Sequence, residues 1–177
     1  MLFLIPIVVG LGLGLLAGGK LENLTRLQFR WPWVVVGAVL VREVILLTPL
    51  NTVEGVQYAY LVALVVIVAW TNWHWRSVRG IWIVSIGAAL NVLVIAANGA
   101  RMPVAPAVAG VLARRGTIGQ YTLMGPSTNL NPLGDWIRIP PAPGVYSIGD
   151  VLIAVGLAIV VFLALRNPRP YKELSPR

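Results

Sequence analysis

The chain has 177 residues, 58% of them hydrophobic and only 11% charged, with a mean hydropathy of +0.81, which excludes a water-soluble globular domain and predicts a polytopic membrane protein. The net charge of +8 comes from basic residues too scattered between apolar stretches for a groove-binding face, so we expect no nucleic-acid partner. There is no cysteine and a single histidine, so disulfides, thiolate sites and histidine clusters are excluded, and we expect neither a metal nor a cofactor.

Five apolar segments approach the length of about 20 residues that crosses the hydrocarbon core of a bilayer as a helix. We therefore predict an all-α fold: one membrane domain over 1–165, built as a polytopic bundle of five transmembrane helices, with a structured outer loop over 98–150. A basic cytoplasmic tail, expected to be disordered, follows over 166–177. The five segments are 2–17, 31–47, 56–70, 81–97 and 151–165.

The first segment is followed, not preceded, by its positive charges, unlike a signal peptide. We predict an uncleaved helix with its N-terminus outside. Gly10, Gly14 and Gly18 lie four residues apart and predict a small-residue face that lets another helix pack closely. The connector 19–30 mixes leucines with polar residues, which indicates a segment lying along the inner membrane surface.

Arg42 and Glu43 lie well inside the second segment, where charges are expensive and normally face a partner or a wet cavity. Adjacent residues on a helix point about 100° apart, so we expect each charge to find its partner elsewhere in the bundle. The favoured interpretation is an ion pair that locks helices together. The alternative is a proton or substrate path.

The basic residues and tryptophans predict the topology. With the N-terminus outside, nine basic residues lie inside and four outside, in agreement with the positive-inside rule. Six of the seven tryptophans fall at the inner ends of segments two to four, as in an interfacial aromatic belt. We expect His74, on the inner side, to be interfacial rather than catalytic. The inner set is Lys20, Arg26, Arg30, Arg76, Arg79, Arg166, Arg169, Lys172 and Arg177, and the outer set is Arg101, Arg114, Arg115 and Arg138.

The region 98–150 then faces the outside. Loops of such length are usually functional or disordered, and the recurrent aliphatic and aromatic residues favour an ordered one. We expect a short surface helix over Val104–Arg115. Four prolines in the second half predict a rigid, irregular connector.

Asp135 and Asp150, two of only six acidic residues, both lie in this region. Taken singly, each has a structural interpretation: Asp150 caps the start of the fifth helix, and Asp135 caps a turn or pairs with Arg138. Taken together they allow chemistry, because two carboxyls brought close in a partly dehydrated site share one proton near neutral pH. One carboxyl then activates water while the other protonates a carbonyl or leaving group. Spacing alone leaves open whether they meet.

The chain resembles a family of small bacterial membrane proteins of unknown function. The likeness spans nearly the whole chain and implies a location in the bacterial cytoplasmic membrane, but no activity. It is carried by G-G-K-L-E-N-L-T-R-L at 18–27, N-G-A-R-M-P-V at 98–104, G-D-W-I at 134–137 and S-I-G-D-V-L-I at 147–153.

The chain also resembles lipoprotein signal peptidase, an aspartyl peptidase with four membrane helices. G-D-W-I is similar to that family's V-D-F element, and S-I-G-D to its N-x-A-D element. The resemblance implies that Asp135 and Asp150 are the catalytic dyad and that segments two to five match the four helices. The chain departs from the family in lacking the aspartate of N-x-x-D-R and in the longer link before Asp135. The implied substrate-binding residues are Asn98, Arg101, Ser147 and Asn51.

Three hypotheses of function follow. The first is a polar site at the outer face that works as a signal-peptidase-like aspartyl hydrolase, or a degenerate relative, on a membrane-anchored peptide or lipid. The second is a non-catalytic accessory or structural subunit of a larger membrane complex, docked through the glycine face and the outer loop. The third is a transporter or channel that uses Arg42, Glu43 and Asn91. The partners expected are membrane lipid and either a membrane-anchored peptide or other subunits.

Overall fold

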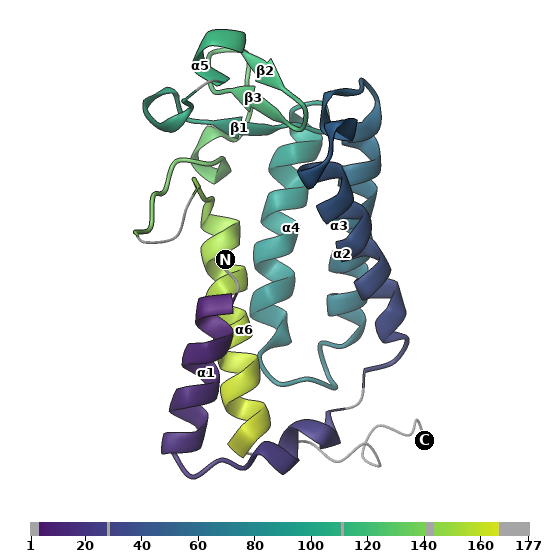
Figure 1. Ribbon diagram of the computed structural model, residues 1–177, viewed down its shortest axis with the longest axis vertical. Helices are drawn as coiled ribbons and strands as arrows, with labels where there is room; N and C mark the ends of the chain where they lie inside the picture. The colour runs from purple at the N-terminus through teal and green to yellow at the C-terminus, as the bar shows by residue number, and fades with distance from the viewer. Residues whose placement is uncertain (1–3, 28, 111, 141–143, 167–177) are drawn as a thin grey trace.

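Five helices make up most of the structure, a computed structural model that describes residues 4–27, 29–110, 112–140 and 144–166 (Figure 1). The tail expected to be disordered lies outside the described residues beyond Arg166. The five helices are α1 (Leu4–Leu16), α2 (Pro32–Leu47), α3 (Val56–Trp73), α4 (Ile81–Ala97) and α6 (Ile148–Arg166).

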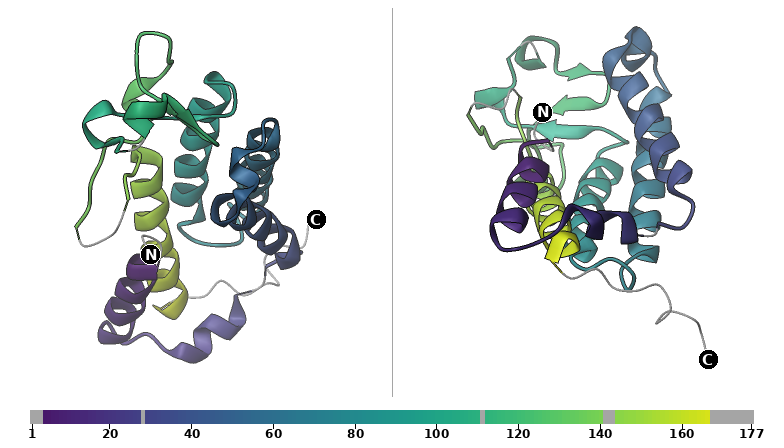
Figure 2. Two further views of the ribbon diagram at one scale, coloured as in Figure 1. Left: turned by 45° about the horizontal axis from the view of Figure 1, so that its top comes forward. Right: turned by 60° about the horizontal axis from the view of Figure 1, so that its bottom comes forward.

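The helices are arranged as a row. α1 packs on α6, α6 on α4, α4 on α3 and α3 on α2, which makes α1 and α2 the two ends of the row. Figure 2 shows these two helices on opposite sides of the molecule. α4 is the central and most buried helix, whereas α1 and α2 expose apolar side chains along most of their length. The central position of α4 makes it the support for both the site and the cap described below.

Small residues set the helix spacing. A Cβ on Gly149 of α6 would lie 2.6 Å from the carbonyl oxygen of Gly87 in α4, so the two backbones meet where no side chain fits. Gly10 and Gly14 of α1 also pack directly against α6, as predicted: Gly10 faces the backbone of Ala158, and Gly14 faces the side chain of Leu165. Gly18 is different: it lies beyond the end of α1 with a φ of 82°, and a Cβ added to it would meet nothing within 4 Å among the described residues, so its predicted packing role is wrong.

A small cap of mixed structure covers one end of the row. Its three short strands are β1 (Met102–Val104), β2 (Thr117–Ile118) and β3 (Tyr121–Leu123), in the order β1-β3-β2. β3 pairs parallel to β1 and antiparallel to β2. The helical pieces of the cap are η3 (Pro106–Val108), α5 (Leu112–Arg115) and η4 (Asn131–Leu133).

The cap corrects two predictions. The fold is mostly helical but contains this sheet, so it is not purely α. The surface helix expected over Val104–Arg115 is replaced by the end of β1 and the separate turns η3 and α5. Proline explains the break, because Pro106 lacks a backbone N–H and disfavours helix at the residue before it. Ala105 accordingly has extended backbone angles, with φ −63° and ψ 136°.

Two helices are suited by length and composition to cross a membrane. α3 and α6 each contain an 18-residue window of high mean hydropathy, 1.5 and 2.7. α1 and α4 are apolar but have 13 and 17 residues. A helix as short as α1 extends about 20 Å, less than the roughly 30 Å of a hydrocarbon core. The two candidate spans, among helices that are largely apolar, indicate membrane association.

The end of the row opposite the cap is closed by the 3-10 helix η1 (Leu21–Arg26) and the chain that follows it. Asn23 donates its side-chain N–H to the carbonyl of Leu165, which ties η1 to the end of α6. His74, expected at the membrane interface, is buried within the protein, with 2% of its surface exposed, and its interfacial position stays a prediction. Its ring packs 4.1 Å from that of Trp70, because the chain entering α2 folds over both.

Candidate functional site

Asp135 lies in the cap, in a chain segment that continues the sheet beyond β1. Its backbone N–H donates to the carbonyl of Pro103 at 2.8 Å, and its own carbonyl accepts from Ala105 at 2.9 Å. Gly134, immediately before it, has no room for a Cβ, which would lie 2.8 Å from the terminal carbon of Met124. The backbone of Asp135 is therefore fixed while its side chain points into the interior.

The Asp135 side chain is buried and incompletely bonded. The residue is 6% exposed, and Oδ1 has no hydrogen-bond partner among the described residues. The pairing with Arg138, one of the two structural alternatives for Asp135, is not seen among the described residues, in which the ion pair is between Arg42 and Glu43. Burial, followed by the nearby charge of Asp150, raises the pKa of Asp135 to about 8. Asp135 therefore carries its proton at neutral pH.

Asp150 is held differently, at the first turn of α6. Its Oδ2 accepts from the backbone N–H of Ser147 at 3.1 Å, and the Ser147 hydroxyl oxygen accepts from the backbone N–H of Asp150 at 3.0 Å. This reciprocal pair is a capping box. Oδ1 of Asp150 also accepts from the Asn91 side chain at 2.9 Å. The capping role predicted for Asp150 is confirmed, and both carboxylate oxygens have donors.

Asn91, Ser147 and Asp150 form a closed triad that joins α4 to α6. The Ser147 hydroxyl donates to Oδ1 of Asn91 at 2.8 Å, which completes the set. Ser147 is fully buried, and Asn91 is 8% exposed. These hydrogen bonds hold the carboxylate of Asp150, in α6, against the central helix α4. The charge of this carboxylate contributes to the raised pKa of the buried Asp135.

We expect Ser147→Ala to lower the free energy of unfolding by about 1–3 kcal/mol, because it removes the cap of α6 and leaves Oδ1 of Asn91 buried without its donor. Thermal unfolding of the purified protein in detergent would measure the loss. Thr128→Ala is the control, since that hydroxyl bonds only within its own loop. If Ser147→Ala loses no more stability than Thr128→Ala, the triad does not stabilise the fold as proposed.

Two tyrosines and an arginine extend the polar cluster from Asp135 toward α2. Burial raises the pKa of Tyr121, on β3, and the neighbouring Tyr60 and Asp135 raise it further, because an ionised Tyr121 would be repelled by the ionised forms of these groups. The Arg42 guanidinium lies over the Tyr60 ring, 5.9 Å from its centroid. Tyr60 itself is buried in the apolar cluster between α2, α3, α4 and the cap. Neither tyrosine was predicted from the sequence as a site residue. The indication that the sequence offers is a phenol hydroxyl among mostly apolar neighbours.

Arg42 and Glu43 correct another prediction. The guanidinium and the carboxylate pair with each other, which was not expected, whereas Arg42 also lies on Tyr60 of the neighbouring helix α3, as the prediction of a partner elsewhere in the bundle requires. Their Cβ atoms point apart, but both side chains are long enough to curl together across the helix surface. The Glu43 side chain is 40% exposed, so the pair lies at the edge of the row and not at its centre.

The other predicted site residues hold loops in place. Oδ1 of Asn98 accepts from the backbone N–H of Asn129 at 2.7 Å, and its side-chain amide donates to the Asn129 carbonyl at 2.9 Å. Arg101 donates through Nε to the Gly119 carbonyl, and Asn51 donates to the Leu46 carbonyl. None of these three side chains hydrogen-bonds either aspartate within the described part of the chain. Their substrate-binding role stays a prediction.

The site therefore consists of a protonated acid and an anchored carboxylate at the capped end of the row, with phenols beside them. Among the described residues no group of three or more His, Cys, Asp or Glu side chains is placed to hold a metal ion. What the pair can do chemically is to donate one proton and accept another.

Comparison with known proteins places the chain in a family but not in a functional class. No curated protein and no solved structure matches it. A family of unknown function, DUF5317, matches residues 26–162, which is well over half of the chain and includes both aspartates, the triad and the cap. The chain belongs to the DUF5317 family.

Proposed function

We propose that the protein is an integral membrane protein of the bacterial cytoplasmic membrane with five membrane-inserted helices, its N-terminus outside and its C-terminus inside. The apolar row and its two candidate spans support this placement. So does the excess of basic residues in the segments at the uncapped end. In this placement the cap and both aspartates lie at the extracytoplasmic face.

At that face, the acidic pair would act as a hydrolytic site of the aspartyl type. The Asp150 carboxylate takes a proton from water, the resulting hydroxide adds to a carbonyl carbon of the substrate, and Asp135 donates its proton to the carbonyl oxygen. Collapse of the tetrahedral intermediate breaks the bond to the leaving group, which departs with the proton held by Asp150, while one hydroxyl of the intermediate returns a proton to Asp135 as the new carbonyl forms. The products are a carboxylic acid and an amine or alcohol, so the atoms balance with one water consumed.

The observation that carries this proposal is the buried Oδ1 of Asp135, which lacks a partner and belongs to a carboxyl that keeps its proton at pH 7. A neutral acid within the electrostatic influence of an anchored carboxylate is consistent with two environments that separate the two proton-transfer roles. The resemblance to lipoprotein signal peptidase suggests the substrate class, a membrane-anchored peptide or lipid. Asn98 and Arg101 would order the site from the turn between α4 and β1.

A second candidate is a non-catalytic subunit of a larger membrane complex. One observation favours it: both oxygens of Asp150 already have protein donors, which is what a purely structural capping residue requires. The exposed apolar faces of the end helices α1 and α2 would then be its docking surfaces. The two candidates differ in whether Asp135 is needed for turnover.

We expect the purified protein in nanodiscs to cleave a diacylglyceryl-modified signal peptide, and Asp135→Asn and Asp150→Asn each to reduce the rate at least a hundredfold. Removing either carboxyl eliminates one of the two proton transfers. Product release would be followed by mass spectrometry. Glu54→Gln, which removes an exposed carboxyl on the same side, is the matched control and should keep the full rate.

Circular dichroism would show that each variant keeps its helices. If the wild type leaves the peptide intact, the hydrolytic proposal fails and the subunit candidate replaces it. Wild-type cleavage that only Asp150→Asn abolishes would assign both proton transfers to that residue and would also reject the pair.

A further inference from the structure

At the end opposite the cap, the chain entering α2 is locked onto the end of α3. The backbone N–H of Arg30 donates to Nε2 of His74 at 2.9 Å, and the Trp70 indole N–H donates to the Arg30 carbonyl at 3.0 Å. Since Nε2 accepts a hydrogen bond, the His74 proton is on Nδ1, which donates to the Trp70 carbonyl at 2.8 Å. Both backbone polar groups of Arg30 are thereby fixed.

Aromatic rings surround this junction. Phe29 lies 5.4 Å from Trp70, and Trp31 lies 6.1 Å from Trp73, measured between ring centroids. Trp31 has a φ of 54°, an unfavourable angle for a bulky residue, and its carbonyl also accepts from the Trp70 indole. We refer to Phe29, Trp31, Trp70, Trp73 and His74 as the aromatic clasp.

The Arg30 side chain is held on the outside of the aromatic clasp. Its guanidinium carbon lies 5.5 Å from the centroid of the Trp73 ring, in a cation–π arrangement. Among the described residues no carboxylate pairs with the Arg30 guanidinium; the ion pair found there joins Arg42 to Glu43. An arginine stacked on an indole keeps its N–H edges available, and a planar fork of donors matches a phosphate.

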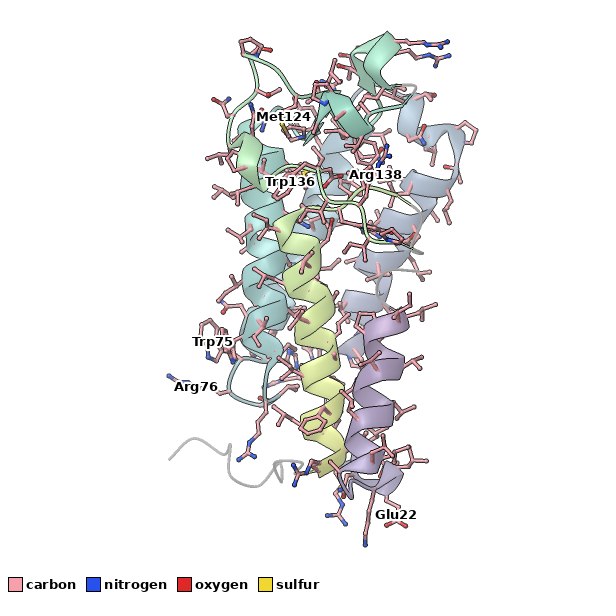
Figure 3. All side chains as sticks on the ribbon, turned by 90° about the vertical axis from the view of Figure 1, so that its left-hand side faces the viewer. Glu22, Trp75, Arg76, Met124, Trp136 and Arg138 are labelled. Carbon is pink, nitrogen blue, oxygen red and sulfur yellow. The ribbon has the colours of Figure 1, made fainter. Side chains whose placement is uncertain are left out.

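The surroundings of Arg30 combine positive charge with exposed indoles. Trp31 is 52% exposed and Trp73 is 56% exposed. Figure 3 shows Trp75, Arg76 and Glu22 at this end, opposite Met124, Trp136 and Arg138. In the described parts of the connecting segments at this end, one acidic residue, Glu22, stands against five basic ones. The basic residues are Lys20, Arg26, Arg30, Arg76 and Arg79.

We propose that Arg30, stacked on Trp73, binds the phosphate of an anionic phospholipid head group, with Trp31 and Trp73 at the boundary between head group and acyl chain. Exposed indoles at the ends of apolar helices favour a lipid over a soluble phosphate, because indoles partition to the head-group level of a bilayer. The fixed backbone favours a defined site over diffuse attraction, since less side-chain freedom is lost on binding. The proposal rests on the membrane placement and is independent of the acidic site at the other end.

The test is a titration of the full-length protein in detergent micelles with phosphatidylglycerol, phosphatidylcholine or inorganic phosphate, followed by the thermal unfolding midpoint. Phosphatidylglycerol should raise the midpoint of the wild type, and the other two should not. Arg30→Gln should weaken the apparent affinity for phosphatidylglycerol about tenfold, the loss of one charge-assisted pair. Arg26→Gln, which removes an equal charge from η1 away from the aromatic clasp, should change it less than about twofold.

Arg30 supports the fold through its backbone, which glutamine retains, so the variant should fold. Trp73→Leu supplies a second route: it removes the ring beneath the guanidinium and should weaken binding severalfold, while Arg30→Lys should fall between wild type and Arg30→Gln. Equal losses with Arg26→Gln and Arg30→Gln would reduce the effect to diffuse attraction and overturn the site. Equal shifts with phosphatidylcholine, or with inorganic phosphate, would overturn the choice of an anionic lipid.

Discussion

Asp135→Asn is expected to make the protein more stable at pH 7 and to remove most of the pH dependence of its stability between pH 4 and pH 8. The carboxyl is 6% exposed, its Oδ1 has no partner, and its pKa is raised from 3.8 to about 8. An acid with a raised pKa binds its proton more tightly in the folded state than in the unfolded state. Folding is therefore favoured most below the unfolded pKa, and the advantage is lost as pH rises toward 8.

The magnitude follows from the two pKa values. Each pKa unit corresponds to 1.36 kcal/mol, so the wild type should lose about 4 kcal/mol between pH 4 and pH 7 through Asp135 alone. Asparagine does not titrate, so the free energy of unfolding of the Asp135→Asn variant should stay nearly constant over this pH range. Its buried amide lacks partners and costs about 1–3 kcal/mol, which leaves a net gain of about 1–3 kcal/mol at pH 7 and a net loss at pH 4.

Chemical denaturation in mild detergent at several pH values would measure how the free energy of unfolding of the wild type and of the variant changes with pH. Glu54→Gln is the control, because an exposed carboxyl should leave the slope unchanged. If Asp135→Asn retains the wild-type slope, the carboxyl is not protonated in the folded protein and the acid role assigned to it is wrong. A more stable variant without hydrolysis would show that the acid is kept for function at the expense of stability.

Hydrophobic patterning located the helices because each is built from one largely apolar stretch of sequence. The predicted 31–47, 81–97 and 151–165 agree with α2, α4 and α6 to within three residues. The sheet of the cap was missed because its strands have two or three residues, too few for an alternating pattern to register. Strand β1 contains Pro103, which argues locally against a strand.

The candidate site was predictable in part. The helix-start position of Asp150 indicated its cap, and that prediction is confirmed. The link from Asn91 to Ser147 was not predictable, because the two residues are 56 positions apart and meet only when α4 packs on α6. Spacing likewise could not show that Asp135 is buried, since its burial depends on pairing beside β1.

The same packing makes Gly149→Ala a highly disruptive small substitution in α6. An added Cβ would overlap Oδ1 of Asn91 and lie 2.6 Å from the Gly87 carbonyl oxygen. Neither can move away cheaply: the Gly87 oxygen belongs to the backbone of the central helix, and Asn91 is held by Ser147 and Asp150. The methyl group must push α6 off α4, which separates the donors and acceptors of the triad.

We expect Gly149→Ala to lower the free energy of unfolding by about 3–5 kcal/mol, from overpacking together with buried polar groups left without partners. Gly37→Ala in α2 is the matched control: nothing lies within 4 Å of its added Cβ, and alanine is the better helix former, so stability should rise by up to about 1 kcal/mol. Thermal unfolding of both variants in the same detergent measures the contrast. Equal stability of the two would mean that α4 and α6 do not meet at Gly149, and the anchored carboxylate of Asp150 would lose its support.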